Sequence, residues 1–304
     1  MAERTADTDF RGTFHEPPYF EDLSERSAVK LTSILRLTGR PHYTLWAREI
    51  GGPHFKERTG QFFPIYYLDL VVTDVPVESR DPLRVDVHIR LGKHLAADGS
   101  VDRLLSEAWT ELSSTAADGR RLVHGTTHKQ AVFTRPDPDP AKRKVTVLHP
   151  SLGLGSLPSR EIRPFTEADL ARPPEGSIAG EAFADREAHV WSYQQTDPNG
   201  HVHAMDYVRA MEAFVGDQLA RSGWSPASRL FARARVLFRR PCFTGEWYRR
   251  KVRRYVAPDG EELLIGAIVP VAGPDAPAEG RPATVIQLVP KKSLQSGGAW
   301  DKGP

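Results

Sequence analysis

Apolar residues recur along the chain with two periods, one typical of helices and one typical of strands. Helical spacing occurs at residues 24–37 and again at residues 204–220. The apolar face of the first stretch is made by Ala28, Leu31, Ile34 and Leu35. In the second stretch apolar residues cover most of the circumference and polar residues form only a narrow stripe. A helix with this distribution is enclosed by the rest of its fold.

Segments rich in Val, Ile, Tyr and Thr surround these helices, and we expect them to be strands. They are residues 65–75, 83–91, 104–112 and 121–133, followed by 188–194, 229–238, 246–256, 261–270 and 283–289. Asp-Gly turns at 98–99, 118–119 and 259–260 separate several of them. Sequential strands joined by such turns predict antiparallel sheets.

Prolines divide the chain into two parts. Eight of them lie between Arg135 and Gly176, and proline is excluded from helix interiors and central strands. This stretch predicts a linker with one short helix at residues 166–171, where Thr166 and Asp169 suit a helix start. The expected organisation is a first half at 1–134, the linker at 135–176, a second half at 177–290 and a flexible tail at 291–304.

The same order of signals therefore occurs in both halves, although they share few identical residues. One alternative is an ordinary core helix packed on an open sheet. A long buried helix wrapped by a curved antiparallel sheet, twice over, instead predicts an α+β fold of the tandem (double) hot-dog type. In that fold two long antiparallel sheets are each wrapped around a buried central helix.

Composition and charge exclude several classes of protein. The hydrophobic fraction of 39% and charged fraction of 26% are typical of globular proteins, and the net charge of +2 does not argue for nucleic-acid or membrane binding. Cys242 is the single cysteine, so no intrachain disulfide exists and a reducing compartment is expected. The N-terminus lacks the apolar segment of a signal peptide, and no apolar run is long enough to cross a bilayer. We therefore expect a cytoplasmic protein.

The strongest local motif is Gln-Thr-Asp-Pro-Asn-Gly-His-Val-His-Ala-Met-Asp-Tyr at residues 195–207. Its Asp-Pro and Asn-Gly pairs are turn formers, so the preceding strand ends here and a helix begins. The unpaired N–H groups of a helix N-terminus form a site for developing negative charge. Asp197, Asn199 and His201 alternate in sequence, and in an extended loop they would project to one side. The competing interpretation is an Asn-Gly turn capped by Asp197.

This motif resembles that of the acyl-carrier-protein (acyl-ACP) thioesterases, whose second hot-dog half carries Asp-x-Asn-x-His-Val-Asn-Asn and then an aromatic residue. His203 and Ala204 replace the paired asparagines. The resemblance implies that Asp197, Asn199 and His201 are catalytic, positioning and activating water and polarising the thioester carbonyl. It also implies a substrate-binding role for the neighbouring residues Gly200, Val202 and Tyr207.

That family also has a glutamate–cysteine pair downstream of the motif. Cys242 is the match for the cysteine and is a further catalytic candidate, but Pro241 stands where the glutamate is expected. Cys242 is therefore either catalytic or a small buried hydrophobe.

The chain also resembles the double-hot-dog acyltransferase/decarboxylases of polyketide pathways, through Tyr66-Tyr67, the linker and the Asn199-Gly200 turn. That group carries its acyl group on a tyrosine, and the corresponding position here is Phe62, which has no hydroxyl. The departure argues against acyl transfer through this position. Phe62 and Tyr66 remain candidates for substrate binding.

Ten basic residues lie between Arg229 and Arg254. They form either a solvated sheet face or a docking surface, and Arg239 and Arg240 are the candidates for binding an acidic carrier protein or coenzyme A phosphates. No aromatic-interleaved motif for nucleic acid accompanies them. The histidines lack metal-ligand spacing, and there is neither a phosphate-binding loop nor a Gly-x-Ser-x-Gly motif, so no metal, no cofactor and no serine nucleophile are expected.

These signals predict an enzyme that hydrolyses an acyl thioester carried by ACP or coenzyme A, in fatty-acid, polyketide or other secondary metabolism. Two alternatives remain: dehydration, acyl transfer or cyclisation on the same fold, and a non-catalytic acyl-carrier-binding protein. The chain is expected to be a monomer or a homodimer, because two hot-dog halves can pair within one chain.

Overall fold

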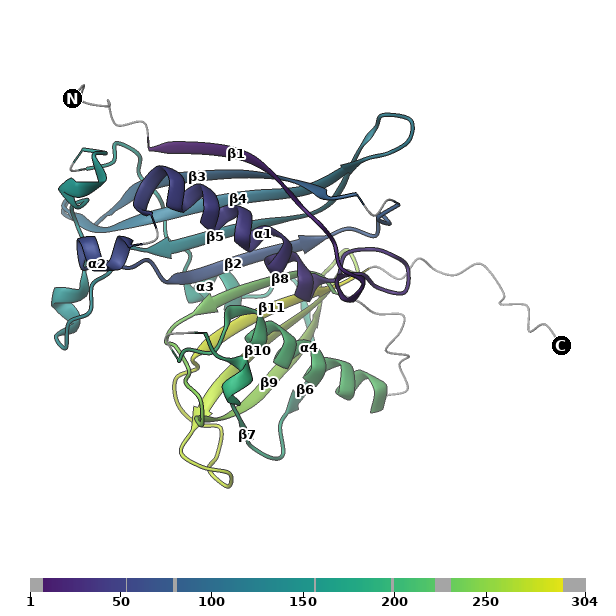
Figure 1. Cartoon of the computed structure of the whole chain (residues 1–304). Helices are drawn as coiled ribbons and strands as arrows, with labels where there is room; N and C mark the ends of the chain where they lie inside the picture. Colours follow the sequence, from purple (N-terminus) through teal and green to yellow (C-terminus); the bar gives the residue numbers. More distant parts are fainter. Residues whose placement is uncertain are drawn as a thin grey trace.

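A single antiparallel sheet of eleven strands forms the body of the protein (Figure 1). The computed structural model describes residues 8–52, 54–78, 81–155, 157–197, 200–221 and 231–291. The strands are β1 (Asp9–Glu16), β2 (Ile65–Val72), β3 (Leu83–Leu95), β4 (Val101–Thr115), β5 (Arg121–Val132), β6 (Ile178–Ala184), β7 (His189–Val190), β8 (Phe231–Phe238), β9 (Trp247–Val256), β10 (Glu262–Val271) and β11 (Thr284–Pro290). Their order is β1-β3-β4-β5-β2-β8-β11-β10-β9-β6, and β7 also pairs with β9.

The strand order contains an internal repeat. In the N-terminal half (β1 to β5) the strand after the helix, β2, lies at one edge, next to the consecutive strands β5, β4 and β3. The C-terminal half (β6 to β11) has the same plan, with β8 at the edge followed by β11, β10 and β9. This order confirms the predicted tandem hot-dog layout, and it shows in addition that the two sheets join edge to edge.

The junction between the halves is the antiparallel pair β2–β8. Its register places Tyr67 opposite Leu237 and Val71 opposite Arg233. On one face Leu68 and Val236 are fully buried in the main core. On the other face the Arg233 guanidinium donates to the Asp69 carboxylate, with Nε 2.8 Å from Oδ1. Both backbone pairing and a charged pair therefore connect the halves.

Two long helices lie on the same side of this sheet, α1 (Leu31–Trp46) over the N-terminal half and α4 (Ala204–Arg221) over the C-terminal half (Figure 1). The predicted position of α4 is confirmed, but one of its faces is exposed, so the rest of the fold does not enclose this helix as expected. The prediction of a helix at 24–37 was wrong at both ends, because residues 23–29 form isolated strand bridges and α1 continues past Gly39 and Pro41. Pro41 is buried, so tertiary packing outweighs its unfavourable helix propensity.

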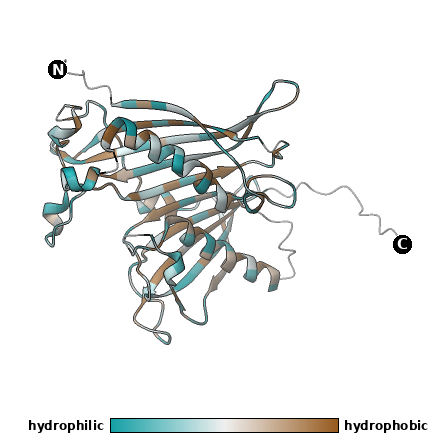
Figure 2. Cartoon of the chain, viewed as in Figure 1, coloured by the Kyte–Doolittle hydropathy of each residue, from teal (hydrophilic) through white to brown (hydrophobic). Residues whose placement is uncertain are grey.

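Apolar residues on the helices and strands meet in one continuous core. Figure 2 shows hydrophobic and hydrophilic bands alternating along the strands, as expected when only one sheet face is covered by helices. Among the described residues, no helix has the length and apolar character needed to span a membrane.

Two strand predictions needed correction at the edge of the C-terminal half. The expected strand at 188–194 is reduced to the two residues of β7, and β6 was not predicted. Most side chains of β6 are exposed, so the strand lacks the apolar alternation that reveals a half-buried strand.

The proline-rich stretch after β5 ends on the sheet face opposite the long helices. It contains two short 3-10 turns (Pro140–Arg143 and Pro150–Leu152) and α3 (Glu167–Ala171), which begins with the predicted Thr166–Asp169 capping box. Leu170 of α3 is buried against Leu237 and Val285. This stretch therefore covers part of the outer sheet face of both halves.

Glycine at position 125 is required by the close approach of β5, β2 and α1. A Cβ atom there would lie 2.5 Å from the Val71 carbonyl oxygen and 2.6 Å from Ile34 Cδ1. We expect Gly125→Ala to lower the free energy of unfolding by about 1–3 kcal/mol in urea denaturation. Gly39→Ala, in α1 with no atom near its added Cβ, is the matched control and should stabilise by about 0.5–1 kcal/mol. Equal effects of the two variants would contradict this account.

Candidate functional site

The predicted motif before α4 folds as a tight turn. The Asp197 N–H donates to the His201 carbonyl oxygen at 2.8 Å, and the Gly200 N–H donates to the Asp197 carbonyl oxygen at 2.9 Å. The Asp197 carboxylate accepts the His201 N–H at 3.1 Å. Gly200 has a φ of 75°, in the left-handed region that favours glycine. Asn199 and Pro198 lie outside the described residues.

This geometry corrects the expectation of an extended loop. Asp197 and His201 lie opposite each other across the turn, so residue alternation along one strand is not what relates them. Directly opposed residues of an antiparallel pair have neighbouring side chains. The two predicted catalytic residues are therefore close together for a different reason than the one expected.

A second loop, residues 239–246, pairs with the motif through its backbone. The Val202 N–H donates to the Cys242 carbonyl oxygen at 2.9 Å, and His201 forms a bridge with Phe243. The His201 and Phe243 rings are in edge contact, with centroids 5.1 Å apart. The predicted motif and the predicted cysteine segment, separated in sequence, thus form one site.

The N-terminus of α4 lies directly after this turn. His203 Nδ1 accepts the Met205 N–H at 3.3 Å, and the His203 carbonyl oxygen accepts the Asp206 N–H at 2.8 Å. The expected row of open N–H donors is therefore partly closed by the chain itself. The positive end of the helix dipole still faces the turn.

Cys242 lies beneath the turn in a buried aromatic layer. Its backbone N–H donates to the Tyr207 hydroxyl at 2.8 Å, and the Cys242 side chain is fully buried. Burial raises the pKa of the Cys242 thiol and also raises the pKa of Tyr207. Trp191 contacts Tyr207 and stacks on Tyr248 with ring centroids 4.0 Å apart. A buried thiol with a raised pKa favours the structural alternative for Cys242 over the nucleophilic one.

Glu246 brings a carboxylate to this loop, and the sequence comparison did not identify it. One Glu246 oxygen accepts the Phe243 N–H at 3.2 Å, and the carboxylate pairs with Arg240 at 3.2 Å. The expected glutamate position holds Pro241, but the loop returns to place Glu246 close to Cys242. The Gly245-Glu246 pair before β9 could have predicted this position. A turn at Gly245, which has a φ of 81°, brings the Glu246 carboxylate back toward Phe243.

Two predicted substrate-binding residues have their contacts elsewhere. The Tyr66 hydroxyl donates to Gln130, whose side chain also accepts the Phe165 N–H at 3.1 Å. Phe62 forms a backbone bridge with Thr134. Among the described residues, no hydrogen bond connects Phe62 or Tyr66 with the 195–203 turn.

The predicted carrier-binding arginines are paired with carboxylates of the same chain. Arg239 pairs with Glu167 of α3, and Arg240 pairs with Glu246. The largely buried guanidinium of Arg250 likewise pairs with Asp185, with Nε 2.9 Å from Oδ2. Much of the basic stretch therefore stabilises the fold and offers less free charge than its composition implied.

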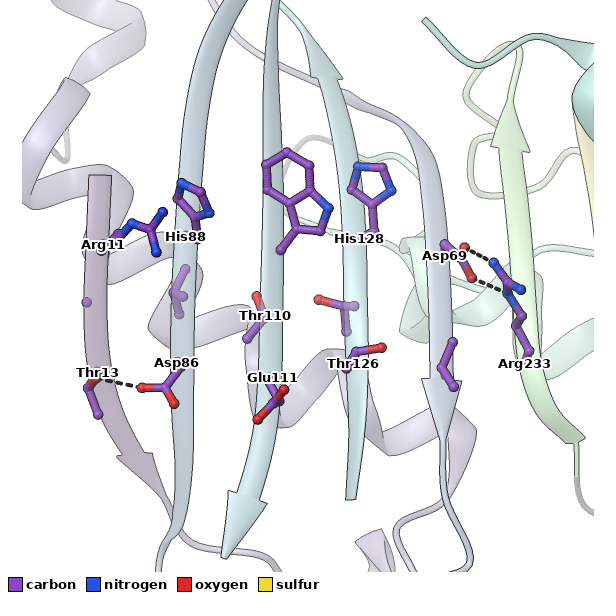
Figure 3. A pocket seen from close by; sticks show the side chains of 15 residues that line it. Arg11, Thr13, Asp69, Asp86, His88, Thr110, Glu111, Thr126, His128 and Arg233 are labelled. Carbon is purple, nitrogen blue, oxygen red and sulfur yellow. Dashed lines mark hydrogen bonds and ion pairs between the residues drawn. The ribbon is translucent and has the colours of Figure 1, made fainter. Parts of the chain in front are cut away.

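An open hollow of about 810 Å³ lies on the outer face of the N-terminal sheet (Figure 3). His88 and His128 point into it, and each is paired with a carboxylate, Asp9 at 2.5 Å and Glu107 at 2.8 Å. None of the residues of the 195–203 turn or the 239–246 loop lines it. The chemistry of the motif is therefore separate from this hollow.

In the described part of the chain, no group of three or more His, Cys, Asp or Glu side chains is arranged to hold a metal ion.

Neither a protein-family model nor a curated protein matches this sequence. Solved structures do match the fold. The 12:0-ACP thioesterase of Umbellularia californica is 10% identical, with a TM-score of 0.55 over 93% of this chain and 94% of that chain. An acyl-ACP thioesterase from Bacteroides thetaiotaomicron is 11% identical, with a TM-score of 0.54 over 96% of this chain and 100% of that chain. These matches confirm the predicted fold over nearly the full length.

The hydroxyl of Tyr207 supports the site from below. We expect Tyr207→Phe to leave the buried Cys242 N–H without its acceptor and to lower the free energy of unfolding by about 1–3 kcal/mol in urea denaturation. Tyr193→Phe removes the same atom from an exposed ring and should change stability by less than about 0.5 kcal/mol. A neutral Tyr207→Phe variant would show that this hydrogen bond does not support the loop.

The burial of the Cys242 thiol predicts that it reacts slowly with alkylating reagents in the folded protein. Because the folded state disfavours the Cys242 thiolate, alkylation by iodoacetamide at pH 8 should be far slower in native protein than in urea-unfolded protein. Mass spectrometry of the labelled chain measures both rates. Rapid native labelling would restore Cys242 as a candidate nucleophile.

Proposed function

We propose that this protein hydrolyses acyl thioesters at the paired loops 195–203 and 239–246. The observation that carries the proposal is the contact of His201, opposite Asp197, with the Cys242–Glu246 segment at the N-terminus of the half-buried helix α4. The motif resemblance and a fold like that of acyl-ACP thioesterases point to the same chemistry.

In this mechanism His201 is the general base. A neutral imidazole has a ring nitrogen that can accept a proton from water as the water attacks. Water adds to the thioester carbonyl carbon while His201 accepts its proton. Asp197, across the turn, orients the imidazole and stabilises its charged form.

Collapse of the tetrahedral intermediate breaks the carbon–sulfur bond. The protonated His201 returns the proton to the leaving thiolate, so the products are a free acid and a free thiol. Negative charge on the carbonyl oxygen faces the positive end of α4, and we assign Asn199 as a further hydrogen-bond donor to it. Gly200 and Val202 hold the backbone close to the substrate, and Tyr207 and Cys242 keep the loop in register.

The acyl carrier is either an acidic carrier protein or coenzyme A. Arg239 and Arg240 remain the proposed carrier contacts, and exchange of their present carboxylate partners for a phosphate would accompany docking. A role in fatty-acid or polyketide metabolism follows from a thioester substrate of this kind. The proposed compartment is the cytoplasm.

Mass spectrometry of acyl-pantetheine and acyl-coenzyme A substrates tests the assignment. We expect the protein to release free acid and free thiol, and His201→Ala to lower kcat/KM by about 100-fold or more because the base is lost. Asp197→Asn keeps the shape but removes the charge and should cost about 10-fold or more.

His203→Asn is the matched control, because it removes a neighbouring imidazole but keeps an acceptor for the N-terminus of α4. It should retain most of the activity. Full activity of His201→Ala would contradict the assignment of the site. An intact thioester whose acyl group has changed in mass would show that the protein modifies the acyl chain and does not hydrolyse the thioester.

A further inference from the structure

A lysine is buried in the interior between α1 and the N-terminal sheet. Lys129 of β5 is 3% exposed, and it is the one lysine or arginine among the described residues that is buried. No hydrogen bond or ion pair of the described residues involves its ammonium group, although the Nζ atom itself is not fully enclosed. Burial lowers the pKa of Lys129 to about 8.

Two further polar groups share this interior face. Thr127 lies two residues before Lys129 on β5, and Thr110 lies opposite Thr127 on β4. Both are 2% exposed, and neither hydroxyl has a hydrogen-bond partner in the described part of the chain. His42 of α1 lies near Lys129, and burial together with that charge holds the pKa of His42 well below its usual value. The cluster thus combines one cation, two hydroxyls and a neutral imidazole.

In the described part of the C-terminal half no lysine or arginine is buried, although the Thr284 hydroxyl of β11 is buried without a partner. There the strand corresponding to β5 is β11, and its Ile286 and Leu288 are buried at the positions that pair with β8. An unpaired buried cation with unsatisfied hydroxyls around it costs stability, whereas apolar residues at these positions do not. A function specific to the N-terminal half accounts for the difference.

The cluster lies within reach of the proposed thioester site. Lys129 pairs with Leu68 of β2, and Leu68 pairs with Val236 of β8. Two strand spacings, about 10 Å, therefore separate the backbones of Lys129 and Val236. The segment from Val236 to Cys242 spans at most about 20 Å, so the two sites lie at most about 30 Å apart.

The helix that covers the cluster is irregular at this end. Pro41 lies inside α1 next to His42, and α1 continues into a π-helical turn at Ala47–Gly51. Pro41 has no backbone N–H to donate, and the π-helical turn makes an i→i+5 bond from the Gly52 N–H to the Ala47 carbonyl oxygen at 2.8 Å. Such turns are frequent at functional sites.

We propose that Lys129, Thr110, Thr127 and His42 bind a carboxylate at the far end of the substrate acyl chain. The inference rests on the proposed function and narrows it to thioesters whose acyl chain ends in a carboxylate. A carboxylate accepts hydrogen bonds from the ammonium group and both hydroxyls, and it neutralises the buried charge. The thioester end of the same chain then lies at His201.

Two measurements test this proposal with separate outcomes. Calorimetry measures binding of non-hydrolysable thioether analogues of coenzyme A, with acyl chains of matched length ending in a carboxylate or in a methyl group. We expect the wild type to prefer the carboxylate by about 10- to 100-fold at the optimal length, and Lys129→Met to abolish the preference. Mass spectrometry of the corresponding thioesters then reports hydrolysis.

Lys129→Met should fold and melt at a higher temperature than the wild type, because it removes a buried charge. Lys142→Met, an exposed lysine-to-methionine change, is the matched control and should keep the carboxylate preference. Thr110→Val with Thr127→Val provides a second variant and should weaken the preference with the lysine intact.

Equal binding of the two chain ends by the wild type, or an unchanged preference in Lys129→Met, would overturn the inference. If the wild type binds both chain ends equally and still hydrolyses methyl-ended thioesters, the proposed thioesterase function holds and the carboxylate site does not. A Lys129-dependent preference without hydrolysis would instead support the carboxylate site and refute the thioesterase reaction.

Discussion

The pairing of β2 with β8 is the interaction on which the rest of the structure depends. It joins two half-sheets of the same strand order into one sheet, with Leu68 and Val236 buried on one face and Asp69 paired with Arg233 on the other. The pairing also orders the two long helices, since α1 contacts both α4 and β8. Because the strands are antiparallel, the end of β8 lies beside the start of β2. The loop that follows β8, which contains Cys242, pairs with His201 and Val202 of the C-terminal half.

Local backbone pairing, more than side-chain spacing, builds the candidate site. The Asp197–His201 turn closes on itself, and Val202 then pairs with Cys242. The Tyr207 hydroxyl holds the same loop from the buried side of α4. A site assembled from two short paired segments needs such support, because loop residues alone are less well ordered than residues on helices and strands.

The two halves share a topology but differ in what their interiors contain. The interior of both halves contains buried hydroxyls without a partner, Thr284 on β11 in one and Thr110 and Thr127 in the other, but of the described residues only the N-terminal half adds a buried lysine, Lys129. On the outer face the ionisable groups are already matched, as with His88 and Asp9. Paired charges on a partly solvated face contribute little and demand no ligand. An unpaired charge in the interior is costly, and it therefore marks the N-terminal half as the more specialised one.

The sequence by itself determined the tandem α+β architecture, α4 and the cysteine-containing loop, because hydrophobic periodicity and turn residues act locally. It placed α1 too early and missed β6, since buried Pro41 and an exposed edge strand are tolerated only through tertiary contacts. Only the folded chain brought Glu246 near Cys242, engaged Arg239 and Arg240 with carboxylates, and buried Lys129. Each of these depends on which strands pair across long sequence separations, and residue pattern within one segment carries no information about that pairing.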